Sequence, residues 1–381
     1  MIVGVAHNII SPLGMTSAGN YAAVEAGRSM LRLYNRLWGL PEPFVASLMD
    51  RGKVEQAFAE ITDNKTYTFF EKMAILSASK AITEASIDPT SKRVLFILST
   101  TKGNVFLLDQ RENGFPKERV LLGTTALQIT RFFQNPNTPL VVSNACISGV
   151  CAQIEAMRNL ESGAFDQVVV IGCDVQSAFI VSGFQSFKAL SDEPCRPFDA
   201  QRKGLNLGDA AATIIYARKD QAGENDWVAC RGAIRNDANH ISGPSRTGEG
   251  SYRALKTALG NVNPDDIAFI NTHGTATVYN DEMESVAIER AGLAQVPVTG
   301  LKGYYGHTMG AAGILETILS MQAVDNHNIL ATKGYETLGV THPLMLSNQN
   351  QPTEKQAFIK LLSGFGGCNA ALLMAKGGMP C

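Results

Sequence analysis

Hydrophobic runs and apolar positions with helical spacing alternate along most of the chain. Three apolar runs bounded by polar residues, at 92–100, 138–146 and 166–175, predict strands that are covered on both faces. From 147 to 160 the apolar side chains recur at helical spacing, and Gly163 provides a stop signal. This region therefore predicts a strand, a tight turn, a helix and a second strand, which together form a βαβ unit.

The second half of the chain repeats this alternation. It predicts a strand at 267–272, a helix at 280–292 (with Asn280 as N-cap), a segment at 297–303 that leads through a glycine-rich loop into a helix at 311–324, and a closing hairpin of 357–363 and 368–376 around the turn GFGG. A polar stretch at 219–226 separates two further predicted strands, 211–218 and 227–235. We therefore place a boundary there, between an N-terminal half, residues 1–218, and a C-terminal half, residues 219–381.

Composition and charge narrow the classes of function. The chain has 381 residues, of which 45% are hydrophobic and 18% are charged, an ordinary globular composition. The net charge of -2 provides no basic field for nucleic acid or an anionic membrane, and no apolar run reaches the ~18 residues of a membrane helix. The apolar start, residues 1–10, has no basic leader and predicts a first strand. We expect a cytoplasmic protein without membrane insertion.

Cys146 has the setting of a nucleophile. It ends a predicted buried strand and opens a helix, where free backbone N–H groups and the helix dipole favour the thiolate. A lone cysteine is nevertheless more often a packing residue, because cysteine is among the most buried residue types. The other six cysteines lack this setting, and we assign them, as reduced thiols, to packing or to the surface: Cys151, Cys173, Cys195, Cys230, Cys368 and Cys381.

Two of the six histidines, His273 and His307, lie in loops rich in glycine and threonine that follow predicted strands. α/β proteins bind their ligands at such strand ends. A single loop histidine is usually structural, but two in matching settings, together with Cys146, favour a shared site. Zinc binding by these three side chains is the rival hypothesis. No fourth ligand is arranged with them in the sequence, so we expect no metal.

Three nearby features have both a functional and a structural interpretation. Lys302 precedes His307 by five residues and either raises the local positive potential or is solvated. Thr275 and Thr277 alternate, so both hydroxyls face one side of an extended segment, where they hold a polar amide chain or finish a turn. The turn GFGG directs a backbone N–H into a cleft or simply connects a hairpin.

Taken in order along the chain, these segments resemble a known family. The motifs are SNACISG, CRPFDAQRKGLNLGDAA, NDANHISGP, INTHGTATVYNDEMES, GLKGYYGHTMGAAGILE and LLSGFGGCNAAL. Together they are similar to those of the elongating β-ketoacyl-acyl-carrier-protein synthases, which are condensing enzymes. The resemblance implies an α/β protein with the thiolase fold, in which two similar βαβαβ-type halves form a layered αβαβα core.

The resemblance also implies a reaction, a decarboxylative condensation of an acyl thioester with malonyl-carrier protein. Cys146 would accept the acyl group, and the backbone N–H groups of Cys146 and Phe365 would form the oxyanion hole. His273 and His307 would polarise the malonyl thioester, stabilise the enolate and assist decarboxylation. The pathway would be fatty acid, polyene or polyketide biosynthesis, and the enzyme would be an acyltransferase.

Supporting roles follow from the same resemblance. Lys302 would support the site electrostatically, Glu316 would organise the loop of His307, Thr275 and Thr277 would contact pantetheine, and Phe365 would gate the acyl pocket. No cofactor is implied, since the substrates travel on the phosphopantetheine of an acyl carrier protein. The chain would pair as a homodimer, or as a heterodimer with a related synthase subunit, and we predict the strand at 166–175 as the interface element.

Two alternatives stay open. Chain-length-factor subunits share the fold but lack the nucleophile, so the presence of Cys146 and both histidines argues against a non-catalytic partner. A coenzyme A thiolase or acyltransferase would use a second cysteine near the end of the chain. Cys368 lies in the closing hairpin, but at the place where the synthase motif has threonine. The segment between Gly103 and Cys146 is shorter than is typical of the elongating enzymes, and it leaves acyl-chain specificity open.

Overall fold

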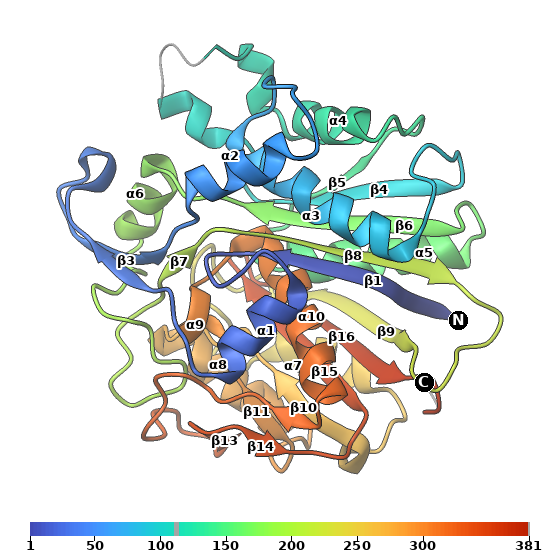
Figure 1. Ribbon diagram of the computed structural model, residues 1–381. Helices are drawn as coiled ribbons and strands as arrows, with labels where there is room; N and C mark the ends of the chain where they lie inside the picture. Colours follow the sequence, from blue (N-terminus) through green and yellow to red (C-terminus); the bar gives the residue numbers. More distant parts are fainter. Residues whose placement is uncertain (110–113, 380–381) are drawn as a thin grey trace.

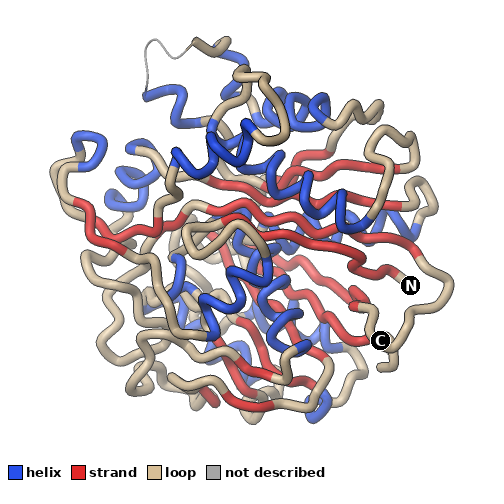
Figure 2. The backbone as a smooth tube through the Cα atoms, in the orientation of Figure 1, coloured by secondary structure: helices blue, strands red, loops and turns tan. Residues whose placement is uncertain are grey.

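The structure, a computed structural model, describes residues 1–109 and 114–379. Eleven strands within the described residues form one sheet made of two half-sheets (Figures 1 and 2). The first half-sheet has the order β1 (Ile2–Ile10), β8 (Ala210–Arg218), β6 (Gln167–Asp174), β4 (Val94–Ser99) and β5 (Leu140–Val142). The second has the order β9 (Trp227–Asn236), β16 (Cys368–Lys376), β15 (Ala357–Gly364), β10 (Ile267–Asn271), β11 (Pro297–Thr299) and β13 (Met345–Leu346).

The two half-sheets meet along a short line. Strands β1 and β9 are antiparallel there, through the pairs Val3–Val228 and Gly4–Trp227. The polar stretch 219–226 connects β8 to β9, and therefore runs from one half-sheet to the other.

Helices cover both half-sheets and also fill the space between them (Figure 1). The central layer holds α5 (Ser148–Glu161) and α10 (Ala312–Asp325), each of which contacts strands of both half-sheets. Helix α3 (Phe69–Ala85) covers the outer face of the first half-sheet, and α7 (Glu249–Leu259) with α8 (Val278–Arg290) covers that of the second. This order of helix, sheet, helix, sheet, helix is the layered αβαβα core that the resemblance predicted.

Glycine allows the central helices to approach closely. A Cβ atom on Gly149 of α5 would lie 2.8 Å from the Cα of Gly313 of α10, and one on Gly313 would lie 2.6 Å from the backbone nitrogen of Val150. Both distances are too short for a side chain, so the helices touch backbone to backbone. This contact matters for the site because Cys146 directly precedes α5 and His307 precedes α10.

The remaining elements surround this core. They are α1 (Ser17–Glu25), β2 (Arg32–Tyr34), β3 (Phe44–Ser47), α2 (Arg51–Ala59), α4 (Leu122–Phe132), α6 (Ala178–Ser186), β7 (Leu207–Gly208), α9 (Lys302–Tyr305), β12 (Asn328–Ile329) and β14 (Gln351–Pro352). Strands β2, β3 and β7 form a small separate sheet, and β12 pairs with β14. Short 3₁₀ turns lie at Leu37–Gly39, Val105–Asp109, Lys117–Val120, Pro264–Asp266 and Met309–Ala311. Within the described residues, no helix is long and apolar enough to cross a membrane.

Two predictions made from the sequence need correction, and the order of the sheet restricts a third. The strand predicted at 138–146 ends at Val142, because the following residues form the turn that leads into α5. Helix α8 begins at Val278 and not at 280; Asn280 lies inside its first turn and donates a hydrogen bond to Glu284 (2.8 Å). The strand predicted as the subunit interface is β6, which is paired with β4 on one side and β8 on the other. It has no free edge, so it cannot join two subunits by strand pairing.

Candidate active site

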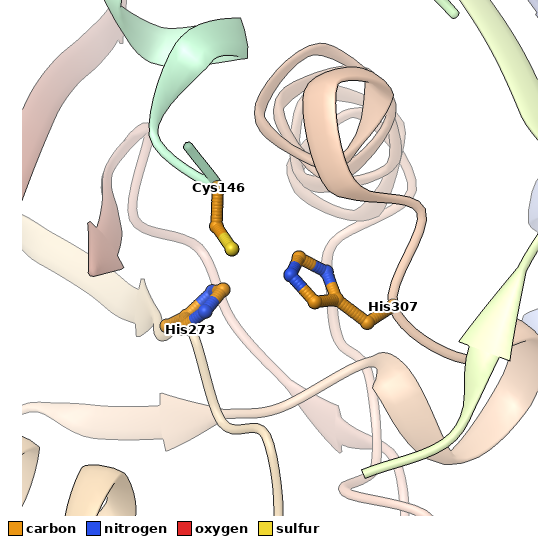
Figure 3. Close-up of side chains that lie close together, drawn as sticks. All are labelled: Cys146, His273 and His307. Carbon is orange, nitrogen blue, oxygen red and sulfur yellow. The ribbon is translucent and has the colours of Figure 1, made fainter. Parts of the chain in front are cut away.

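The three predicted reactive side chains meet in one place (Figure 3). The sulfur of Cys146 and one imidazole nitrogen from each of His273 and His307 lie within 4.8 Å of one another, and all three residues are buried. The two rings are nearly perpendicular, at 83°, with their centroids 5.0 Å apart. They come from the turn before α5, the loop after β10 and the loop after α9, which confirms the predicted convergence of segments distant in the sequence.

A strained turn presents Cys146. The preceding residue, Ala145, has a φ of 45°, in the left-handed region that residues with a side chain rarely adopt. The hydroxyl of Ser148 stabilises this turn, because it accepts the N–H of Asn144 (2.8 Å) and donates to the carbonyl of Ala145 (2.6 Å). The turn places Cys146 directly before the first residues of α5, as the sequence predicted.

The charge state of Cys146 differs from the expectation. Burial raises the pKa of its thiol to about 12, the neighbouring Cys368 adds to that rise, and the positive charges of Lys302 and Lys102 oppose it. Burial therefore favours the thiol over the thiolate at neutral pH, contrary to the predicted thiolate, because the charged form loses its solvent. A base must take the proton when the sulfur attacks.

Both imidazoles are neutral. Burial, with a further contribution from the positive charge of Lys302, lowers the pKa of His273 and of His307 well below the ordinary 6.5. Nδ1 of His307 accepts the backbone N–H of Met309 (3.3 Å), which leaves the ring proton on Nε2. Within the described part of the chain, neither Nε2 of His307 nor Nδ1 of His273 has a hydrogen-bond partner. Both nitrogens are available to a substrate.

Helix α8 holds the loop of His273. The carboxylate of Glu284 accepts the backbone N–H groups of His273 (2.6 Å) and Gly274 (2.8 Å), and it also accepts the side-chain amide of Asn280. Burial raises the pKa of Glu284 to about 7. Sequence reasoning did not assign this role to Glu284, although it lies in the quoted motif INTHGTATVYNDEMES.

A buried group of charges lies behind the imidazoles. The ammonium of Lys302 donates to the carbonyl of His273 (2.5 Å) and to the carboxylate of Glu316 (2.9 Å). Lys360 of β15, which the sequence analysis missed, pairs with the other oxygen of Glu316 (2.6 Å). Although burial alone would raise it, the pKa of Glu316 is held below its usual value by these two lysines. Because this group holds one carboxylate and two ammonium groups, it places a net positive charge behind the imidazoles.

The residues predicted to bind and gate the substrate lie near this site. The hydroxyls of Thr275 and Thr277 are 3.0 Å apart, as expected if they face the same side of the segment. A Cβ atom on Gly364 would lie 3.1 Å from the backbone nitrogen of Cys146, so the GFGG turn adjoins the nucleophile. Phe365 packs on Phe187, with ring centroids 5.4 Å apart. Their roles toward pantetheine and the acyl chain remain predictions.

One of the other cysteines, Cys230, differs from the expectation, whereas Cys368 is a buried packing residue, as predicted, that also adjoins the nucleophile. Cys368 is not remote from the site: its sulfur would be 2.9 Å from a Cβ atom on Gly364, and it donates to the carbonyl of Phe365 (3.2 Å). Cys230 is disulfide-bonded, which contradicts the expectation of a reduced thiol at that position. Cys151, Cys173 and Cys195 are free and buried, as packing residues would be, and Cys381 lies outside the described residues.

The spacing of Cys146, His273 and His307 would also suit a metal ion, so zinc needs a test against the electrostatics. Within the described residues, no fourth histidine, cysteine or carboxylate belongs to this group. Lys302 and Lys360 both act to lower the pKa of each imidazole, so the potential at the rings is positive and opposes a dication. The arrangement is better suited to stabilise negative charge that develops on a substrate.

Comparison with known proteins gives the family of this chain. Residues 2–222 match the N-terminal domain of the β-ketoacyl synthases, and residues 228–336 match their C-terminal domain. The two matches cover most of the chain. The chain therefore belongs to the β-ketoacyl synthase family.

Individual relatives agree with this assignment. The chain is 30% identical to 3-oxoacyl-[acyl-carrier-protein] synthase 2 of Rhizobium meliloti over 279 residues, which cover 68% of this chain and 66% of that protein. It is 32% identical to nodulation protein E of Rhizobium leguminosarum, over 51% of this chain and 50% of the relative. The chain thus spans between half and two thirds of the length of these relatives. The tetracenomycin ketoacyl synthase alpha subunit of Streptomyces glaucescens is 28% identical over 99% of this chain and 96% of its own.

Solved structures share the fold. A ketosynthase from Xenorhabdus doucetiae, solved in complex with its chain length factor, superposes with a TM-score of 0.85 at 23% identity over 98% of both chains. A β-ketoacyl synthase from Burkholderia phymatum superposes with a TM-score of 0.84 at 22% identity, over 98% of this chain and 99% of its own. At this identity the likeness establishes the fold, which is the thiolase fold predicted from the sequence motifs.

Proposed function

We propose that this protein is a β-ketoacyl-[acyl-carrier-protein] synthase, an acyltransferase that joins an acyl group on Cys146 to a malonyl unit with loss of carbon dioxide. One observation carries the proposal: a buried thiol and two neutral imidazoles with unpartnered nitrogens converge in positive surroundings. Membership of the β-ketoacyl synthase family supports it.

The first half-reaction transfers the acyl group. The sulfur of Cys146 attacks the carbonyl of the incoming thioester and passes its proton to a neighbouring imidazole, because the resting group is a thiol. The negative oxygen of the tetrahedral intermediate accepts backbone N–H groups of Cys146 and Phe365. The bond to the carrier sulfur then breaks, and the departing thiolate recovers the proton. The acyl group is left as a thioester on Cys146.

The second half-reaction makes the carbon–carbon bond. The malonyl thioester loses carbon dioxide, and the electron pair of the broken bond forms an enolate whose oxygen accepts hydrogen bonds from His273 and His307. Neutral rings suit this task, because each can donate an N–H hydrogen bond to the enolate oxygen and still keep its proton. The enolate carbon attacks the acyl thioester, the carbon–sulfur bond breaks, and the thiolate of Cys146 takes up a proton from solvent.

The substrate carrier and the subunit partner are part of the proposal. Thr275 and Thr277 would hold the phosphopantetheine arm of an acyl carrier protein, and Phe365 would control entry to the acyl pocket. The protein would use no cofactor of its own and would work in the cytoplasm, in fatty acid, polyene or polyketide biosynthesis. It would act as a homodimer or pair with a related subunit; one structural neighbour was solved with a chain length factor, which supports the second arrangement.

Cys368 supports one rival. A second thiol beside the nucleophile is what a coenzyme A thiolase would need, and Cys368 lies against the same GFGG turn as Cys146. Burial raises the pKa of Cys368 to about 11, which makes it a poor base at neutral pH. The sulfur also donates its proton to the carbonyl of Phe365. We therefore prefer the synthase.

The test compares the two extender substrates on the purified protein. Acyl-carrier proteins of several chain lengths are offered first, and the acyl-enzyme is detected by intact-protein mass spectrometry. Malonyl-carrier protein or acetyl-coenzyme A is then added, and carbon dioxide release and product are measured. The proposal requires condensation with malonyl-carrier protein. Condensation with acetyl-coenzyme A alone would favour a thiolase, and the absence of any acyl-enzyme would favour a non-catalytic partner subunit.

A further inference from the structure

Lys360 is a charged residue in a strand that is otherwise apolar. It is fully buried in β15, the strand AFIKLLSG, and its alternation partners Phe358 and Leu362 belong to the hydrophobic core. A lysine in such a row is costly to bury, so its surroundings must compensate for the lost water.

Four oxygens surround the ammonium of Lys360. They are the side-chain oxygen of Asn271 (2.6 Å), the carbonyl of Asn271 (3.2 Å), the carbonyl of Thr272 (2.9 Å) and a carboxylate oxygen of Glu316 (2.6 Å). An ion pair would need only Glu316. The amide of Asn271 also turns its oxygen toward Lys360 and leaves its buried nitrogen without a partner within the described residues. The group is therefore a cage of oxygens around a monovalent cation.

The cage lies at the end of β10, the strand whose following loop carries His273. Asn271 and Thr272 directly precede His273, and the carbonyl of His273 accepts from Lys302. Three successive carbonyls thus point at two lysine ammonium groups, which share the carboxylate of Glu316. Since Glu316 belongs to α10, this network joins the loop of His273 to the helix that follows His307.

We propose that Lys360 is a positioning residue whose ammonium serves as a built-in monovalent cation, fixing the end of β10 so that the imidazole of His273 faces Cys146. Its positive charge also helps to keep both imidazoles neutral, after burial and Lys302. The catalytic part of this inference rests on the proposed function. The oxygen cage itself does not, and a small cation should occupy it when the lysine side chain is shortened.

The test uses two substitutions with opposite consequences for the cage. Lys360→Ala opens it, whereas Lys360→Met fills it with an uncharged side chain of similar length. We expect each to slow decarboxylation of malonyl-carrier protein about 10–100-fold, as loss of an outer-shell partner does, mainly in kcat and with acylation of Cys146 retained. Ammonium or potassium chloride should restore activity to Lys360→Ala and not to Lys360→Met. Tetramethylammonium chloride, which is too large for the cage, should restore neither.

A matched control is Lys355→Ala. Lys355 is exposed, and its ammonium donates to the carbonyl of Ile267 at the other end of β10 (3.2 Å). This variant should keep wild-type decarboxylation and show no response to ammonium.

A second readout separates this inference from the proposed function. At equal ionic strength, the midpoint of thermal unfolding of Lys360→Ala should be higher in ammonium chloride than in tetramethylammonium chloride. This expected difference does not depend on whether the protein condenses substrates. A folded Lys360→Ala whose stability and decarboxylation both ignore ammonium would overturn the proposal. If Lys360→Ala does not fold under any of these salts, Lys360→Met decides: full decarboxylation by that variant would also overturn it.

Discussion

At the scale of single residues, the neutral state of His273 and His307 determines how the reaction should respond to pH. Their pKa values are lowered well below 6.5, so the rings take up a proton only at pH values below that figure. Decarboxylation by enzyme that is already acylated should therefore keep its rate from about pH 7.5 to about pH 6, where an ordinary histidine titrates. Carbon dioxide release measured across this range checks it on the wild type and on Glu284→Gln, because the carboxyl of Glu284, which holds the loop of His273, has a pKa of about 7. A half-maximal rate near pH 6.5 in both proteins would contradict it.

Cys146 is the predicted acyl acceptor. Cys146→Ala should abolish acyl-enzyme formation, because no other thiol in the described residues follows a strained turn at the start of a helix beside both imidazoles. Intact-protein mass spectrometry after incubation with acyl-carrier protein measures this. Cys151→Ala is the matched control, since Cys151 is a free, buried cysteine of α5, and it should acylate normally. An acylated Cys146→Ala that still condenses would show that the site is assigned wrongly.

His307 should act after acylation. Its Nε2 proton has no partner and is available to the enolate, so His307→Ala should retain an acyl-enzyme but lose about 10²–10³-fold in decarboxylation. The control is His342→Ala, because His342 pairs with Glu289 on the surface. Acylation by mass spectrometry and carbon dioxide release are measured on the same samples. Full decarboxylation by His307→Ala would mean that the ring is structural.

At the scale of secondary-structure elements, the contact between α5 and α10 leaves no room for a side chain on either facing glycine. Gly313→Ala would place a Cβ atom 2.6 Å from the backbone nitrogen of Val150, so one helix must shift. We expect a loss of about 1–3 kcal/mol in the free energy of unfolding, as for other overpacked cores, together with slower acylation of Cys146. Urea denaturation measures the first effect.

Gly123→Ala is the control for that substitution. Gly123 lies in α4, and nothing lies within 4 Å of a Cβ atom built on it. Because alanine loses less conformational entropy than glycine in a helix, this variant should be unchanged or more stable by up to about 1 kcal/mol. Equal destabilisation by both substitutions would show that the close contact of α5 and α10 is not what opposes alanine at Gly313.

Most elements could be predicted from the sequence because they depend on local patterns. The apolar runs correspond to β4, β6, β8, β9, β10 and β15, and the helical spacing after Cys146 corresponds to α5. Element ends and burial were less predictable: β5 ends before Cys146, and it is a partly exposed edge strand and not one covered on both faces, because an apolar run does not show which elements pack against it. For the same reason an apolar run could not reveal that β6 is an internal strand.

The site was predictable where its residues stand in local motifs, and not where they depend on distant partners. Cys146, His273 and His307 each follow a strand, so their convergence follows from the fold. Lys360 was missed because its oxygen partners belong to β10 and α10, far away in the sequence. The available signal was a single lysine in the middle of an apolar strand. The thiol state of Cys146 was missed because the depth of burial is a property of the whole fold.

At the scale of the whole molecule, the open edge of the sheet changes the prediction about subunits. Since β6 is internal, a subunit interface built by strand pairing would use one of the two edge strands, β13 or β5. We expect β5, which pairs with β4 on one side only, because β13 is just two residues long. Leu140 of β5 is 36% exposed. We expect the protein to be a dimer by light scattering at micromolar concentration, and Leu140→Lys to weaken it, because a charge on that edge would be desolvated on pairing.

The control for this prediction is Leu33→Lys. Leu33 lies on β2, in the small separate sheet, and is 54% exposed. The Leu33→Lys substitution should leave the dimer intact. A monomeric wild-type protein would contradict dimerisation itself, whereas an intact dimer of Leu140→Lys would place the interface elsewhere.

The narrow junction between β1 and β9 has a consequence for how this chain can be divided. Cys146 belongs to the half that precedes the connection at 219–226, and both imidazoles belong to the half that follows it. A polypeptide cut within that polar connection would yield two pieces, neither of which holds a complete reaction centre. Condensation would then return only when the pieces reassociate, so turnover could serve as a reporter of fragment complementation.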